Sequence, residues 1–508
     1  MKLKKSKKII SGIVLGLIVI FGIVIGLNYY LQAEIKSAIE NQLTNSQIEY
    51  EEVNVSILDR SSSVSKPKLQ LDNISMEADV LEVKKLSYTN YFLSGKIVIG
   101  AIEIKDPNVA IYKKDTLAKA RDKKERPNLS KDVVIENIHI KGGNLRFLEN
   151  DSIQNKLYVS LNEFDLYNVQ ISDKTLQAFL PFEYERMEIS GDSVFYSMND
   201  EHHLAIKNLK IKDGDITLNN LRIIPNFSKS EFDRRISVEK DRFEVEIEKV
   251  DISALNWDFE QDSIQLKSPF IEINKAYLKV YRNKLLPDDT SIKPLYSRML
   301  REMGMKIKFD SVVLKNSRIV YEEKTNATRP PGELNFSDVN VNLKNITNIG
   351  LSSPDFPETK IKISALLMGK SPLNLNWKFD VRDPQDKFTI SGDMEGISAD
   401  AMNSFLRPTM NIEVEGKIQS LFYNFRGDNN LASGDMRMQF RDFKVEVLKK
   451  DGSRKNSFLS DLANIIIRND DNSEKLERKD IQAERDKTKS FWNYLWLLIR
   501  NGSLKSFL

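Results

Sequence analysis

The sequence predicts a mainly β protein: an elongated, twisted antiparallel β-sheet or groove of repeated hairpins, with an N-terminal transmembrane helix and a few short helices. Three observations predict it. An apolar pattern at positions 0, +3, +5, +10 and +12 recurs along the chain, a turn-forming tetrapeptide follows position +5 in several copies, and a long uncharged segment precedes them all. No linker rich in Pro, Gly or Ser divides the middle of the chain, which favours one long β-structure over several separate domains.

The apolar pattern is most credible where its tetrapeptide is rich in turn-forming residues. The second copy has Lys105-Asp106-Pro107-Asn108 in this position, and the third has Lys141-Gly142-Gly143-Asn144. Such residues preset or tolerate the backbone angles of turns. The clearest copies begin at Leu71, Ile99, Ile135, Ile206, Ile247 and Phe309.

The spacing predicts a hairpin with one apolar face. Cross-strand partners in an antiparallel hairpin have a constant index sum, and +5 with +10 and +3 with +12 both sum to fifteen. The step from 0 to +3 breaks strict alternation and predicts a β-bulge. We therefore expect a run of curved hairpins whose apolar side chains share one face.

An apolar face on a membrane-attached sheet suggests a path for acyl chains, which favour burial by about 0.8 kcal/mol per methylene. The alternative is a sheet whose interior is filled by its own side chains. The candidate lipid-contacting residues are the inward-facing repeat positions Ile102, Ile104, Val109, Ile111, Ile138, Ile140, Leu145, Phe147, Leu209, Ile211, Ile216, Leu218, Val250, Ile252, Trp257, Phe259, Val312, Leu314, Ile319 and Tyr321.

The N-terminus predicts a membrane anchor. Residues Ile9 to Leu27 form an uncharged run of about nineteen residues, close to the length needed to span a bilayer as a helix. The preceding lysines hold the N-terminus in the cytoplasm, and Tyr29 and Tyr30 would lie at the membrane interface. A cleaved signal peptide is the alternative, although its apolar region should be shorter. The bulk of the chain is then expected outside the cytoplasmic membrane.

The C-terminus ends in an aromatic segment after a highly charged stretch. It is too short to span a bilayer, and two readings remain open: a segment lying in a membrane interface or in a partner's groove, or a helix that closes the open end of the sheet. The candidate membrane-interface residues here are Phe491, Trp492, Tyr494 and Trp496.

These features predict five segments. They are a cytoplasmic basic tail and transmembrane anchor (1–31), a linking helix (32–48), a repeating β-groove body (49–450), a helix and charged linker (451–489), and an aromatic amphipathic C-terminal segment (490–508). Residues 293–303 have helix-like character and are expected as an insertion within the body.

The sequence offers no catalytic constellation. It contains no cysteine and only three histidines, and it has neither a nucleophile elbow nor a phosphate-binding loop. His139 lies between Ile138 and Ile140, as a solvent-facing strand residue would. The net charge of +3 is exceeded by the five lysines near the N-terminus, which does not suggest nucleic-acid binding. We expect no enzyme, no metal site and no cofactor.

Three parts of the sequence resemble the AsmA-like family, whose repeating β-grooves are related to bridge-like lipid-transfer proteins. The first is the lysine-led span that runs into a helix and then into extended segments between Leu86 and Val109. The second is the stretch from Ile397 to Leu406, followed by Val414 to Ile418, and the third is Gly434 to Val445. The chain departs from the family by lacking a glycine between Asn41 and Tyr50.

The resemblance implies a single-pass inner-membrane protein, with a cytoplasmic N-terminus and a periplasmic body, that carries phospholipids toward the outer membrane. Its implied partners are phospholipids and the inner membrane, with the outer membrane or an envelope protein reached through the C-terminal segment. The alternative function is a membrane-tethered scaffold for outer-membrane biogenesis, with a filled β core and no lipid transport.

Overall fold

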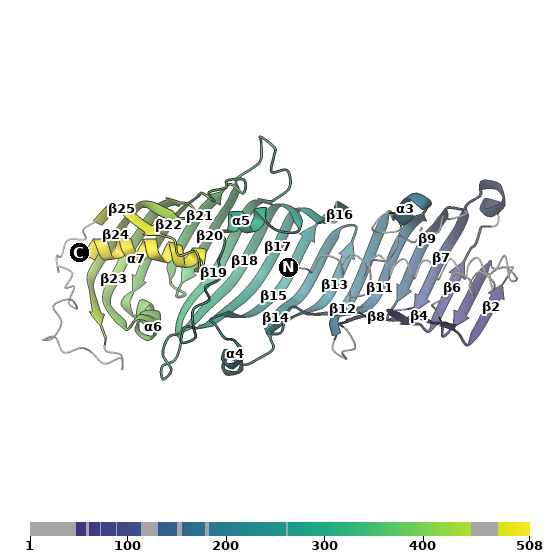
Figure 1. Cartoon of the computed structure of the whole chain (residues 1–508), viewed down its shortest axis with the longest axis horizontal. Helices are drawn as coiled ribbons and strands as arrows, with labels where there is room; N and C mark the ends of the chain where they lie inside the picture. Colours follow the sequence, from purple (N-terminus) through teal and green to yellow (C-terminus); the bar gives the residue numbers. More distant parts are fainter. Residues whose placement is uncertain are drawn as a thin grey trace. The chain divides into compact units, whose positions relative to one another are not determined.

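The structure is a computed structural model that describes residues 47–56, 60–71, 73–87, 89–112, 131–149, 155–177, 182–260, 263–448 and 476–507. The described chain is mainly β, as the sequence predicts (Figure 1). The predicted anchor at Ile9 to Leu27, the linking helix up to residue 46 and the helix after residue 451 lie outside the described residues. The last two residues of the predicted linking helix, Gln47 and Ile48, belong to a strand instead. Among those described, no helix is both long enough and apolar enough to cross a bilayer.

The chain forms two compact units, Met1–Asn220 and Leu221–Leu508, a division that the sequence patterns did not indicate. The strands of the first unit are β1 (Gln47–Glu49), β2 (Glu52–Ser56), β3 (Ser61–Ser65), β4 (Lys68–Leu71), β5 (Ile74–Glu77), β6 (Val80–Lys84), β7 (Ile97–Lys105), β8 (Asn108–Tyr112), β9 (Val133–Lys141), β10 (Asn144–Leu148), β11 (Asn155–Ile171), β12 (Arg186–Ser197) and β13 (His202–Lys212). A π-helical turn, η1 (Asn90–Ser94), and a short helix, α3 (Asp173–Gln177), accompany them.

Strands β7 and β8 show that the repeat is a bend in a strand and not a hairpin. β7 pairs with β6 and β9, whereas β8 pairs with β5 and β10, so the two segments never pair with each other. The hydrogen-bond ladder runs on through the bend, because Asp106 N donates to Lys141 O at 2.8 Å and Asn144 N donates to Pro107 O at 2.7 Å. The predicted hairpin is therefore wrong here.

Most other copies of the repeat are also bent strands and not hairpins. β5 and β6 also lie end to end without pairing with each other, and β9 and β10 both pair with the single long strand β11. Only the copy at Ile206 resembles the predicted turn: Asp213 and Gly214, with φ of 51° and 85°, join β13 to β14 (Asp215–Pro225). Positive φ at both residues is typical of a two-residue hairpin turn.

A bend keeps the apolar positions on one face because it contains one extra residue. Positions +5 and +10 would point to opposite faces of a straight strand, and a single bulged residue restores their common side. The bulged residues include non-glycines with positive φ, namely Asp106 at 48° and Asn316 at 50°. The predicted break in alternation between positions 0 and +3 is present in the copy at Ile135, where Ile135 and Ile138 are both fully buried. No residue is inserted relative to β11, because the pairs Tyr167–Asn137 and Val169–Ile135 keep the same register across the break.

The sequence predicts an antiparallel sheet, but the observed sheet is mixed. β7 runs parallel to β9 and β8 runs parallel to β10, so the copies beginning at Ile99 and Ile135 lie side by side in register. A third parallel pair joins β17 to β18 in the second unit. A parallel pair needs a crossover between its strands, which a chain of hairpins does not supply.

The strands of the second unit are β15 (Asp241–Ser253), β16 (Asn256–Glu260), β17 (Ser263–Asn283), β18 (Lys306–Lys324), β19 (Gly332–Thr347), β20 (Thr359–Leu367), β21 (Ser371–Phe379), β22 (Phe388–Ser398), β23 (Ile412–Gly427), β24 (Leu431–Val447) and β25 (Leu476–Glu484). β15 and β16 are again two parts of one bent strand, since both pair with β17. β25 corrects the prediction of a charged linker over these residues. Its alternation was hidden because only Ile481 and Ala483 mark the buried side.

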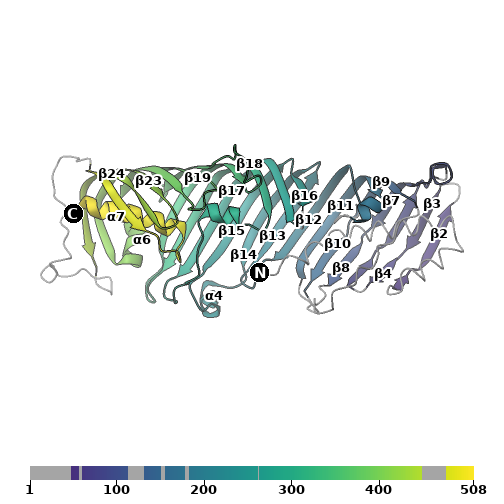
Figure 2. The ribbon, with the colours of Figure 1, turned by 45° about the horizontal axis from the view of Figure 1, so that its top comes forward.

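The described residues of this unit form four helices: α4 (Lys229–Arg235), α5 (Tyr296–Arg301), α6 (Ala399–Met410) and α7 (Phe491–Phe507). α5 lies inside the predicted helix-like insertion and is shorter than it. α7 lies across β22–β24 in both views of the ribbon (Figures 1 and 2).

Candidate functional site: the apolar floor

The second unit carries apolar side chains in register across ten neighbouring strands. The first row joins Ile252, Ile271, Val312, Leu343, Ile361, Trp377, Ile390, Phe425, Gly434 and Ile481, each directly opposite the next. The second joins Val250, Ile273, Leu314, Val341, Ile363, Leu375, Gly392, Tyr423 and Met436. Residues directly opposite on paired strands point to the same side of a sheet, so both rows lie on one face.

α7 covers the part of this face that β21–β25 provide. The ring of Phe491 stacks on that of Trp377, with 4.3 Å between centroids and 4° between planes. Phe388 meets both Phe491 and Tyr494 edge to face. Farther along the helix, Gly502 allows close contact, because a Cβ there would lie 2.8 Å from side-chain atoms of Ile481 and Met436. At this end of the unit the apolar rows are a closed core.

The crossover from β17 to β18, residues 284–305, covers the same core beside α7. Leu295 is buried in it, and the ring of Tyr296 meets those of Trp377 and Phe491 at 5.3 and 6.2 Å. Polar contacts hold the crossover in place. Arg301 donates to Asp386 Oδ1 at 2.8 Å and to Val381 O at 2.6 Å.

A buried carboxylate joins the crossover to the start of α7. Glu239 is 4% exposed and meets Lys284 Nζ at 2.5 Å and Lys489 Nζ at 3.0 Å. The Lys489 ammonium also meets Asp288 at 2.9 Å. Burial lowers the pKa of Lys489, but these two carboxylates outweigh it and raise the pKa above its usual range. Lys489 therefore stays charged, and its ion pairs link the crossover to the residues that precede α7.

The rows are less covered where they cross β15–β19. We call the eight positions Val250, Ile252, Ile271, Ile273, Val312, Leu314, Val341 and Leu343 the apolar floor. Six of these eight are only half-buried, whereas Ile390 and Phe425, farther along the first row, are 0% and 1% exposed. α6 lies near one end of the same strands, where the ring of Phe405 is 6.4 Å from that of Tyr321. The side chains of the apolar floor therefore contact their neighbours in the sheet but remain partly accessible to a further apolar group.

The predicted lipid-contacting residues fall into two groups. Seven are buried: Ile102, Ile104, Val109, Ile111, Ile138, Ile140 and Val250. Twelve are half-buried: Leu145, Phe147, Leu209, Ile211, Ile216, Leu218, Ile252, Trp257, Val312, Leu314, Ile319 and Tyr321. The side chain of Phe259 lies outside the described residues, as do Tyr29 and Tyr30.

In the first unit the repeat positions on β7, β8 and β9 form a filled core, whereas those on β10, β13 and β14 are half-buried. Ile102 lies opposite Ile138 and Ile104 opposite Ile140, and all four side chains are at most 3% exposed. They belong to one cluster with residues from β3–β9 and β11. Acyl chains have no access to side chains in this state, so these four positions do not serve as an open lipid path.

The predicted interfacial residues of α7 separate onto two sides of the helix. Phe491 and Tyr494 are 4% and 1% exposed and pack on the sheet, whereas Trp492 and Trp496 are 46% and 39% exposed. Of the two readings of this segment, closure of the sheet describes its position. Phe491 and Tyr494 could reach a membrane only if α7 left the sheet, while the two tryptophans face outward.

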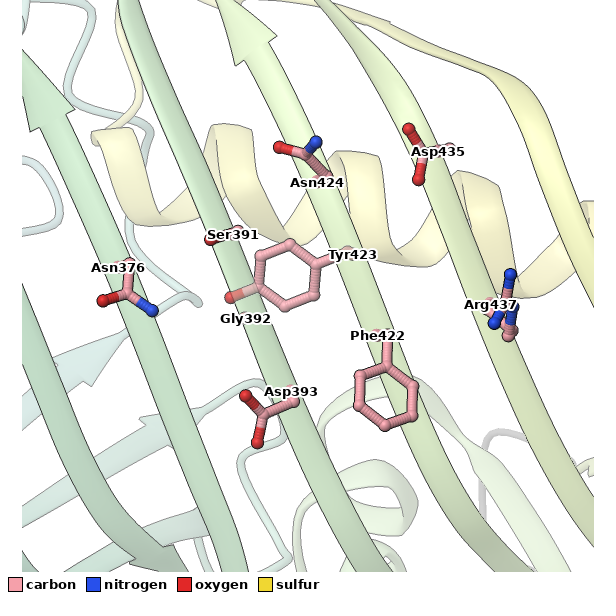
Figure 3. A pocket seen from close by; sticks show the side chains of 9 residues that line it. All are labelled: Asn376, Ser391, Gly392, Asp393, Phe422, Tyr423, Asn424, Asp435 and Arg437. Carbon is pink, nitrogen blue, oxygen red and sulfur yellow. The ribbon is translucent and has the colours of Figure 1, made fainter.

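A shallow polar depression lies on the opposite face of the sheet from α7 (Figure 3). Its volume is about 270 Å³, and Asn376, Asp393, Asn424, Asp435 and Arg437 contribute polar side chains to it. Asn374 Nδ2 donates to Asp393 Oδ2 at 2.8 Å. Phe422, 45% exposed, also lines the depression, which lies on the other side of the sheet from the apolar rows.

His139 has a specific polar contact with the neighbouring strand. Its Nδ1 lies 2.8 Å from Asp165 Oδ1, its direct cross-strand partner. Within the described residues, no group of three or more acidic or histidine side chains could hold a metal ion.

Sequence reasoning missed half of the floor, including Ile271, Ile273, Val341 and Leu343. β17 alternates as Ile271, Ile273, Ala276 and Leu278, with one residue inserted after Asn274. Period-two alternation that allows one skipped residue would have found this strand.

Comparison with models of known protein families gives no match, and comparison with curated proteins gives none either. The AsmA-like resemblance therefore remains a prediction.

Proposed function

We propose that the apolar floor of the second unit binds the acyl chains of phospholipids, and that the protein is an AsmA-like, inner-membrane-anchored periplasmic protein that carries lipid toward the outer membrane. One observation carries the proposal. The same in-register rows form a closed core under α7 but are only half-buried across β15–β19. The N-terminal segment is predicted to span a membrane, and the protein keeps an apolar surface partly accessible. Such a surface suits a ligand with long apolar chains.

Polar surroundings support a lipid more than a fully apolar ligand. Lys249 and Asp251 flank Val250 and Ile252 on β15 and form an ion pair of 3.0 Å on the other side of the strand. The strand thus keeps one wet and one apolar side, so a headgroup can remain in water while its chains lie on the floor.

Lipid co-purification tests the proposal. The full chain is purified in mild detergent, and bound phospholipid is measured by mass spectrometry. Val312→Asp and Leu314→Asp place a charge on the floor and are expected to abolish bound lipid while the protein still folds. Val313→Asp is the matched control, because this half-buried side chain points to the other face of the same strand. Absence of lipid from the wild-type protein, or equal loss in the control, would contradict the proposal.

A scaffold for outer-membrane assembly is the second candidate. The filled core around β7–β9 and the closure of the second unit by α7 favour it, since the apolar side chains of both regions are already buried by the chain itself. The same measurement separates the two functions. A folded wild-type protein that carries no lipid, and whose floor variants remain functional in the envelope, would favour the scaffold.

A further inference from the structure

The outer face of β18–β23, opposite the apolar rows, carries an unusual row of like charges. Lys344, Lys360 and Lys378 lie directly opposite one another on three successive strands, and Thr389 separates them from Arg426 in the same row. Lys308 and Lys362 flank the row. Neighbouring strands are about 4.8 Å apart, and like charges directly opposite destabilise a sheet.

Carboxylates do not neutralise this row as they do elsewhere on the same side of the sheet. All six cations are exposed, and within the described chain only Lys378 has an ion pair, a loose one of 3.6 Å to Glu358. By contrast, Lys275 meets Glu248 at 2.8 Å and Lys315 meets Glu272 at 2.6 Å. A row of unneutralised charge that costs stability suggests an external anionic partner.

We propose that this basic row docks the protein onto an anionic phospholipid surface. Five of the six cations are lysines, whose flexible point charges suit many headgroups better than one fixed bidentate ligand. Phe270, 37% exposed, continues the row on β17: it lies opposite Ser311, which in turn lies opposite Lys344. Cations with an adjacent exposed aromatic ring are typical of membrane-surface contacts. The contact lies on the other face from the floor and does not depend on lipid binding there.

Vesicle capture tests the docking surface. The full chain is reconstituted into phosphatidylcholine vesicles, and capture of fluorescent vesicles with or without phosphatidylglycerol is measured at low and high salt. We expect strong preference for the anionic vesicles, weakened by salt. The K344Q/K360Q/K378Q variant should lose capture about a hundredfold, since each cation near an anionic surface contributes about fivefold.

The matched control is K212Q/K275Q/K315Q, which removes the same charge from exposed lysines that have carboxylate neighbours. It should capture nearly as well as the wild-type protein. The row variant should melt no lower than the wild-type protein, because it relieves repulsion between the lysines. Equal capture of neutral vesicles, or equal loss in the control, would overturn the proposal. Binding of polyglutamate without capture of anionic vesicles would also overturn it, in favour of an acidic protein partner. Loss of capture with normal lipid content separates this surface from the floor.

Discussion

The repeat positions on β7–β9 of the first unit and those on β15–β18 of the second have the same spacing but different surroundings. In the first unit, Ile102 and Ile138 lie opposite each other on parallel strands and are fully buried. In the second, Ile271 and Val312 are also opposite on parallel strands, yet Val312 is only half-buried. The difference lies in what covers the face. A repeat therefore specifies which way side chains point, and the coverage decides whether they form a core or a binding surface.

The largest loss of stability is expected from a substitution in the part of the second unit that α7 covers. Phe491→Ala removes the ring stacked on Trp377 and should cost about 3–5 kcal/mol of unfolding free energy. Urea unfolding followed by tryptophan fluorescence measures it. Trp496→Ala, at a side chain 39% exposed on the same helix, is the control and should cost less than about 1 kcal/mol. Similar losses in both variants would mean that α7 does not close the core.

A second pair of substitutions sharpens the contrast between core and floor. Ile138→Ala should cost about 2–5 kcal/mol, because it leaves a cavity among fully buried neighbours. Leu314→Ala on the floor should cost only about 1 kcal/mol, since its side chain is already partly exposed. Denaturant unfolding of the full chain gives both values. Equal costs would show that the floor is packed as tightly as the core.

The bends of the first unit offer a smaller effect. Gly143 has φ of 103°, and a Cβ there would lie 2.5 Å from Pro107 O. We expect Gly143→Ala to cost about 1–3 kcal/mol through both strain and contact. Gly350→Ala is the control, because its φ of 77° carries strain but no atom lies within 4 Å. If both variants lower the melting temperature equally, the cost comes from backbone strain alone and not from the contact with Pro107.

The smallest effect is a pH dependence on the outer side of the second unit. Burial raises the pKa of Glu322, but the ammonium groups of Lys229 and Lys279 outweigh it and lower the pKa below its usual range. Because the folded-state pKa is lowered, the stabilisation is present near neutral pH and is lost as the pH falls through the lowered pKa. Glu322→Gln should remove on the order of 1 kcal/mol and flatten this part of the pH profile of melting temperature. An unchanged profile would contradict the role of this ion pair.

The apolar face could be predicted from the sequence, but the way the chain forms it could not. A reversal of direction and a bend with one extra residue both bring Ile104 and Val109 to the same side, so the index sum fits either. What separates them is the partner of each strand, and the parallel pairing of β7 with β9 has no local signal. The coverage by α7 was equally hidden, because Phe491 and Trp492 look alike in sequence and differ only in the side of the helix they occupy.

The aligned bulges set a rule for how such a sheet can change in length. In the second unit Lys275, Asn316 and Asp338 all have positive φ at neighbouring places on β17, β18 and β19. Inserting a residue into one strand would move its bulge away from those of its neighbours and turn the following side chains to the wrong side. Adding whole strands at an edge disturbs none of them. The sheet can therefore gain whole strands at its edges, whereas the number of residues in each existing strand is fixed by its aligned bulges.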